Sequence, residues 1–128
     1  MKPTLLFVLI FTGVAAFGQE NLNDFMTEHS PEQRAQFQTD YMKENLSLTD
    51  DQLTKIQGIN LKYAEKMQEA YEAPTKKLQK QKALQRINAE KEGELKLTLS
   101  PDQYATYEKN KEAMKKKIKE RAAEKSEQ

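Results

Sequence analysis

The sequence contains no cysteine and no tryptophan, a single histidine, and only four glycines and four prolines in 128 residues. Without cysteine the chain can form no disulfide, and it has no thiolate to act as nucleophile or metal ligand. One histidine and no glycine-rich loop leave too few converging groups for nucleophilic catalysis. The sequence therefore predicts a protein that is not an enzyme and that carries no cofactor.

Apolar residues make up 37% of the chain, below the roughly 45–50% of an average globular domain. A closed monomeric core would be thin, so we expect long helices, a homodimer, or both. The formal net charge is only +1, which argues against a nucleic-acid-binding protein. Residues 19–54 carry two basic and eight acidic side chains, whereas residues 55–128 carry 18 basic and 12 acidic ones. This asymmetry indicates that oppositely charged surfaces matter for assembly or partner choice.

The first 18 residues have the pattern of a secretory signal peptide. A short basic start, Met1-Lys2-Pro3, precedes an apolar run over 4–16, and Ala16 and Gly18 supply the small residues of a cleavage site. The apolar run is too short for a bilayer-spanning helix, which needs about 20 residues. We therefore expect cleavage between Gly18 and Gln19, and a periplasmic protein with no stable membrane anchor.

One short pattern, a Ser or Thr followed three positions later by Gln, occurs as Leu48-Thr49-Asp50-Asp51-Gln52 and again as Leu99-Ser100-Pro101-Asp102-Gln103. A reduced copy is Ser30-Pro31-Glu32-Gln33. The pattern is a capping box, in which the hydroxyl and the Gln side chain satisfy backbone N–H groups at a helix start. In the two full copies, apolar residues flank the box as a hydrophobic staple. The structural motif residues are Leu48, Thr49, Gln52, Leu53, Leu99, Ser100, Gln103 and Tyr104.

Periodicity between these starts predicts an all-α fold. We expect helices over 30–45, from Thr49 to a break at 71–74, over 75–92 with Leu78 among its anchors, and one last helix from Ser100. Gly93 is a plausible stop or kink, followed by an extended or helical approach over 95–99. The predicted organisation is a flexible arm at 19–29, a helical domain at 30–123 and a disordered tail at 124–128. About four helices would form hairpins in an open, cradle-like arrangement.

The functional prediction rests on amphipathic helix faces, because methionine and tyrosine suit adaptable apolar contacts and lysine keeps such a surface soluble. The predicted client-binding residues are Tyr63, Met67 and Met114, with Lys62, Lys66 and Lys115 on the rim. His29 is expected outside the core; it could hold a metal only together with Asp24, Glu28 or Glu32, so metal sensing is a weaker alternative.

The two full motifs resemble the LTxxQ motif of the Spy/CpxP-like exported proteins, and with the signal peptide the resemblance covers nearly the whole chain. It implies a periplasmic helical protein that forms a cradle-like dimer. It also implies an ATP-independent chaperone for unfolded or misfolded exported proteins, or a stress-response accessory that binds a sensor kinase. The His-rich termini of metal-responsive members are missing here. In that family the motif residues are structural, and Thr49, Gln52, Ser100 and Gln103 are expected to have the same role.

Overall fold

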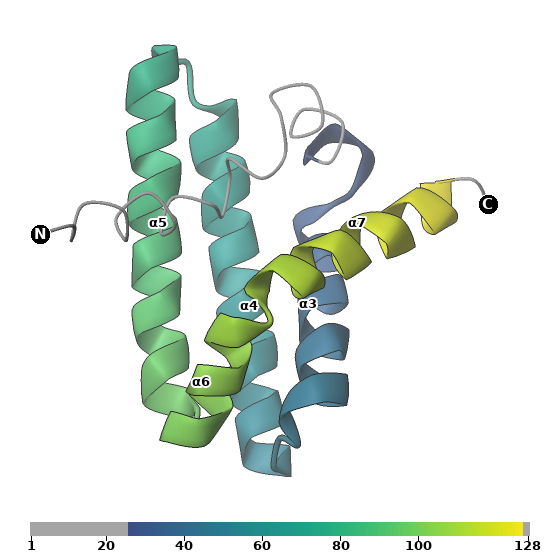
Figure 1. The fold of residues 1–128 in the computed structure, drawn as a ribbon. Coiled ribbons are helices and arrows are strands. Elements are labelled where there is room, and N and C mark those ends of the chain that lie inside the picture. Colours follow the sequence, from purple (N-terminus) through teal and green to yellow (C-terminus); the bar gives the residue numbers. More distant parts are fainter. Residues whose placement is uncertain (1–25, 127–128) are drawn as a thin grey trace, which may run out of the picture.

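A computed structural model describes residues 26–126, and every regular element in that range is a helix. The elements are α3 (Pro31–Leu46), α4 (Asp50–Glu72), α5 (Lys77–Thr98), α6 (Pro101–Lys109) and α7 (Lys111–Ser126). Figure 1 shows α4 and α5 as a long antiparallel hairpin, with α3 on the other flank of α4 and α6–α7 crossing in front. The predicted all-α class with helical hairpins is confirmed. The predicted dimer stays a prediction.

All three predicted capping boxes are present. Each hydroxyl accepts the backbone N–H three residues later at 3.1 Å, and each Gln Oε1 accepts the N-cap N–H at 2.9 or 3.0 Å. They start α3, α4 and α6 at Ser30, Thr49 and Ser100. Ser47 ends α3 with a φ of 51°, in the left-handed region, which lets the chain turn into α4 within three residues.

The sequence prediction for α5 was wrong at both ends. The helix begins at Lys77 and runs through Gly93 to Thr98. Leu95 is fully buried, so its burial in the core keeps the chain helical beyond a glycine that costs only about 1 kcal/mol. Of the extended and helical alternatives predicted for 95–99, the helical one is therefore observed, up to Thr98. Leu78, expected as an anchor, is instead 61% exposed.

The predicted last helix is broken in two. Asn110 ends α6, donating its backbone N–H to Thr106 O at 3.0 Å, and α7 starts at the next residue in a new direction. Helix α7 reaches Ser126, into the segment predicted as a disordered tail. The bend carries α7 across α3, where Met114 and Ile118 are buried.

The core lies between α3, α4 and the α5–α6–α7 segment. Asn60 at its centre is fully buried and donates from Nδ2 to Thr39 Oγ1 at 3.0 Å, which ties α4 to α3. The large apolar members of the cluster come from all five helices or the residues that join them: Phe37, Tyr41, Met42, Leu46, Ile56, Ile59, Tyr63, Ile87, Leu95, Leu99, Tyr107, Met114 and Ile118.

The predicted signal peptide and its cleavage site lie outside the described residues, as do residues 19–25 of the predicted arm. Within residues 26–29, the rest of that arm, Met26 and His29 are buried, whereas Thr27 and Glu28 are exposed. His29 is only 6% exposed, its ring meets the edge of Phe37 at 5.7 Å, and its carbonyl accepts from Arg34 Nη1 at 2.5 Å. The expectation that His29 lies outside the core is thus wrong, because its contacts with Arg34 and Phe37 bury it against the start of α3. Among the described helices, none combines the length and apolar character that spanning a bilayer requires.

Candidate functional site

The side chains of Gln52 and Gln103 join the two full motifs directly. Gln52 Nε2 donates to Gln103 Oε1 at 2.7 Å, and Gln103 Nε2 donates to Gln52 Oε1 at 3.0 Å. Each oxygen also accepts the N–H of its own N-cap residue. The motifs are therefore two halves of one junction between the starts of α4 and α6.

The same two amides extend to the ends of the preceding helices. Gln103 Nε2 lies 3.1 Å from Leu46 O at the end of α3, and Gln52 Nε2 lies 3.3 Å from Thr98 O at the end of α5. Carbonyls at helix ends have no partner within the helix, so each amide satisfies one of them. The junction holds four helix ends together.

The predicted apolar client contacts are packed inside the fold. Tyr63 is 4% exposed and Met114 is 7% exposed, and both belong to the core cluster, while Met67 is half-buried against it. They come from two helices, Tyr63 and Met67 from α4 and Met114 from α7. Their role in client binding stays a prediction, and it requires an opening of the fold.

The predicted rim lysines are ion-paired. Lys62 Nζ lies 2.6 Å from Glu94, and Lys66 Nζ lies 3.8 Å from Glu90, across the α4–α5 hairpin. The Tyr63 hydroxyl also donates to Glu94, and this hydrogen bond raises the pKa of Tyr63 to about 12. Lys62, Tyr63 and Lys66 thus form one group, and both ammonium groups lie over the Tyr63 ring.

The third rim lysine belongs to a separate region on α7. Lys115 Nζ lies 3.5 Å from Glu112 on the same helix, and partial burial lowers the pKa of Lys115. Its neighbour in the chain, Met114, points into the core. The structure therefore divides the single predicted site into one group on α4 and one on α7.

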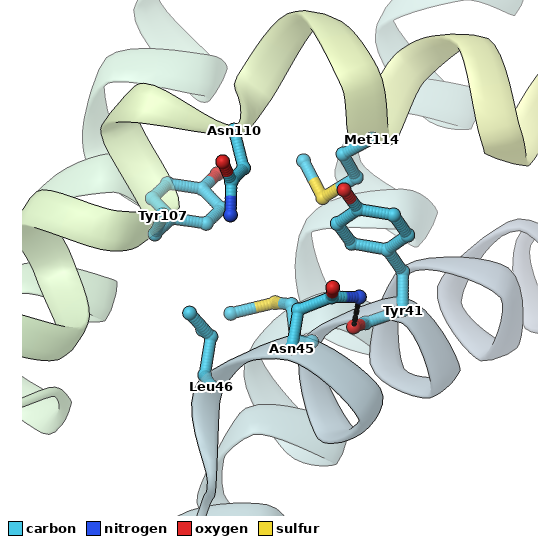
Figure 2. A pocket seen from close by; sticks show the side chains of 7 residues that line it. Tyr41, Asn45, Leu46, Tyr107, Asn110 and Met114 are labelled. Carbon is cyan, nitrogen blue, oxygen red and sulfur yellow. Dashed lines mark hydrogen bonds between the residues drawn. The ribbon is translucent and has the colours of Figure 1, made fainter.

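A small cavity lies beneath the α6–α7 bend (Figure 2). Tyr107, Asn110 and Met114 line it from the bend, and Tyr41 and Leu46 line it from α3, together with Met42 and Asn45. Its volume is about 10 Å³, room for about one water molecule. Two methionines and two tyrosines thus meet where α7 lies on α3.

Helix α7 packs on α3 through apolar and charged side chains. Among the side chains of α7 that the structure describes, Met114 and Ile118 are buried apolar contacts, and Arg121 Nη2 binds Glu44 Oε2 at 2.8 Å on a partly exposed surface. An exposed ion pair contributes little, about 0–1 kcal/mol. Of these three described contacts, the two apolar residues above Tyr41, Met42 and Leu46 therefore contribute most.

The model of a domain of unknown function (DUF4890) matches residues 19–128. The chain belongs to the DUF4890 family. Comparison with curated proteins and with solved structures gave no match. The matched region includes both full motifs and every described helix of this DUF4890 domain, and it starts at the residue after the predicted signal-peptide cleavage. The family match does not include the Spy/CpxP-like proteins, and that resemblance rests on the two motifs together with the signal-peptide pattern and the all-helical chain.

Sequence reasoning missed a buried lysine in the DUF4890 domain. Lys91 on α5 is 9% exposed, and its ammonium donates to Gln38 Oε1 on α3. Burial lowers the pKa of Lys91 to about 8, with a smaller effect from the nearby Lys111 charge. A spacing of four residues from Ile87 and Leu95 places Lys91 on the buried side of α5, which is the signal that could have found it.

The residue next to Lys91 anchors the bend between α6 and α7. Glu92 accepts from the Tyr107 hydroxyl at 3.0 Å and lies 3.2 Å from Lys111 Nζ, so it holds one residue on each side of Asn110. The cavity of Figure 2 is lined by Tyr107 but by neither Lys91 nor Glu92. These charged groups therefore position α7 and do not line an open site.

Metal ligands do not gather in this domain as far as the structure describes it. Over residues 26–126, no group of three or more His, Asp or Glu side chains is arranged to hold a metal ion. His29, the one histidine, is packed against Phe37. Asp24, one of its suggested partners, lies outside the described range.

Proposed function

We propose that this DUF4890 domain is an exported, ATP-independent, chaperone-like binding protein, and that α7 is a movable cover over its client-binding surface. The clients are unfolded or misfolded exported proteins. The proposal includes a periplasmic location, a homodimer and the absence of catalysis. It is supported by the LTxxQ-like motifs and by the signal-peptide pattern, after which the family match begins.

The observation that carries the proposal is the composition of the α3–α7 contact. Met42, Tyr41 and Leu46 on α3 meet Met114 and Ile118 on α7 and Tyr107 on α6. Methionine adapts its shape to different partners, and tyrosine presents both an apolar ring and a polar hydroxyl. Surfaces of this kind bind many apolar segments without demanding one sequence.

The attachment of α7 makes this surface reachable. Rotation about Asn110 would lift α7 without disturbing the capping-box junction, which involves only α3, α4, α5 and α6. Two buried apolar side chains contribute about 1.5–3 kcal/mol each, an amount that a bound apolar client segment could replace. Lysines on α7, including Lys115, would move with the helix and border the opened surface.

Suppression of aggregation tests the proposal. A chemically denatured model substrate is diluted into buffer with the purified protein at equimolar and several-fold higher concentration, without nucleotide, and light scattering is followed. We expect scattering to fall in proportion to the protein added, and added ATP to change nothing. Unchanged scattering at several-fold excess would overturn the proposal. Selective binding of one folded sensor domain would instead favour the accessory function.

A further inference from the structure

We propose that the closed end of the α4–α5 hairpin binds the surface of a membrane that contains anionic lipids. This basic tip consists of Lys76, Lys77, Leu78, Lys80 and Lys82, and it lies at the end of the hairpin away from the capping-box junction (Figure 1). The inference concerns a different surface from the α3–α7 contact and does not depend on the proposed function.

The start of α5 carries positive charge only. Residues 73–89 contain five basic side chains and no acidic one, and the acidic side chains that precede them are Glu69 and Glu72 at the end of α4. Lys76, Lys77 and Lys82 are exposed, and within residues 26–126 none of them forms an ion pair. Lys80 Nζ lies 5.2 Å from the centroid of the Tyr71 ring. The four lysines of the tip therefore outnumber the two carboxylates at the end of α4, and the tip keeps a net positive charge.

A large apolar side chain projects among these lysines. Leu78 is 61% exposed, and in the described range only Leu97 is also a large hydrophobic residue of high exposure. Leu97 lies at the other end of α5, in a stretch that contains acidic residues as well as lysine. Of these two exposed leucines, only Leu78 has neighbours in the chain that are lysines without an ion pair in the described range.

The shape of the tip favours a lipid surface over an acidic peptide. A turn through Pro74 joins the helices, and Figure 1 shows the closed end of the hairpin as a protruding end of the molecule. A peptide is held by contacts on several sides, whereas a flat lipid surface needs only one. Lysines near an anionic leaflet each increase binding, and an exposed leucine can enter the boundary between headgroups and acyl chains.

Vesicle co-sedimentation of the purified protein is the test, with vesicles of phosphatidylcholine alone and of equal parts phosphatidylcholine and phosphatidylglycerol. We expect binding only to the second kind, with weakening as salt is added. One lysine is worth about fivefold in binding. The triple variant Lys77→Gln, Lys80→Gln, Lys82→Gln should therefore bind at least about tenfold more weakly.

Matched variants distinguish the contribution of the basic tip to vesicle binding from the effects of overall charge and of unfolding. The control triple Lys55→Gln, Lys109→Gln, Lys116→Gln removes the same charge from exposed positions elsewhere and should change binding less than about threefold. Leu78→Ser should weaken binding, whereas Leu97→Ser should not. Lys76→Ser should lower binding about fivefold without loss of helical structure, so the decrease would not come from unfolding.

Three results would overturn the inference. The first is equal loss in the tip and control triples, which would indicate non-specific attraction. The second is equal binding to vesicles without phosphatidylglycerol. The third is binding to polyglutamate with none to either kind of vesicle, which would make the tip a surface for an acidic protein.

Discussion

Gln52 and Gln103, 51 positions apart in the chain, exchange hydrogen bonds through their side-chain amides at 2.7 and 3.0 Å. Each also closes a capping box from the third helical position, so one side chain both starts its own helix and holds the other helix start. This double use explains why the motif requires glutamine at this position. A hydrophobic residue could not make either contact, and glutamate would offer no N–H group to its partner.

We expect Gln52→Ala and Gln103→Ala each to lower the free energy of unfolding by about 2 kcal/mol, since each removes a cap and a cross-helix bond. The double variant should lose less than the sum, with a coupling energy of about 1 kcal/mol. Urea denaturation of the wild type, the two single variants and the double variant measures this coupling energy.

Gln33→Ala is the matched control for this cycle. Gln33 completes the capping box of α3 at 2.9 Å but is exposed and has no cross-helix amide partner. Its loss should cost about 1 kcal/mol or less and should be additive with Gln103→Ala. Strict additivity between Gln52→Ala and Gln103→Ala would contradict the junction.

A second prediction concerns Lys76, the N-cap of α5, which makes no side-chain cap hydrogen bond. Gln79 already occupies the third helical position, where the three boxed helices also have Gln. Lys76→Ser should therefore complete a fourth capping box and stabilise the protein by about 1 kcal/mol. Thermal unfolding would show a higher midpoint, and the gain should disappear when Gln79→Ala is added. No gain would mean that the start of α5 is fixed by other contacts.

Two helix-interior glycines provide a third prediction. A Cβ atom added at Gly58 or Gly93 would meet no atom within 4 Å. Gly58→Ala and Gly93→Ala should therefore each stabilise the protein by about 1 kcal/mol, because alanine favours the helix and limits the unfolded chain. The denaturant midpoints of wild type and variants measure the change in stability, and they should be compared at low and at high protein concentration. Destabilisation that grows with protein concentration would show that a second copy approaches the glycine backbone, as in the predicted dimer.

The buried Lys91 leads to a prediction about pH. Its pKa is about 8 in the folded protein and 10.5 in its ordinary state. Between these values the unfolded chain binds more protons, so the Lys91 contribution to stability rises as pH increases and is least favourable at neutral pH. Lys91→Met should stabilise the protein at neutral pH by up to about 3 kcal/mol.

Wild type and Lys91→Met should be compared from about pH 7 to about pH 9.5. The variant's advantage should be largest near pH 7 and should shrink as the pH rises above about 8, the pKa of Lys91 in the folded protein. Glu92, Lys111 and the Gln38 amide face the same ammonium group. A constant advantage over this range would show that Lys91 keeps an ordinary pKa.

The sequence predicted those helix starts and breaks that interactions between residues close together in the chain determine. The starts of α3, α4 and α6 follow from Ser30, Thr49 and Ser100, because a capping box acts within four residues. The break before Pro74 follows from the missing backbone donor of proline. The continuation of α5 through Gly93 could not be predicted from local propensity, because burial of Leu95 outweighs it.

The candidate site depended on contacts that the sequence does not reveal. The spacing of Tyr63 and Met114 indicated apolar helix faces, but not that both faces turn into the core. The bend at Asn110 is set by Glu92, which contacts Tyr107 and Lys111 from another helix. The burial of His29 likewise depends on Arg34 and on Phe37 in the folded chain.

The most direct test of the account is to lock α7 onto α3. Because the natural chain has no cysteine, Glu44→Cys with Arg121→Cys can be joined by a short bismaleimide at the observed ion pair. Lys117→Cys with Glu120→Cys, joined by the same reagent at another exposed ion pair, links α7 only to itself and serves as the control. Light scattering of the denatured substrate is then compared for both proteins before and after cross-linking. The account predicts that the α3–α7 link abolishes suppression of aggregation while the link within α7 leaves it unchanged. Full suppression by the protein with α7 locked would contradict it.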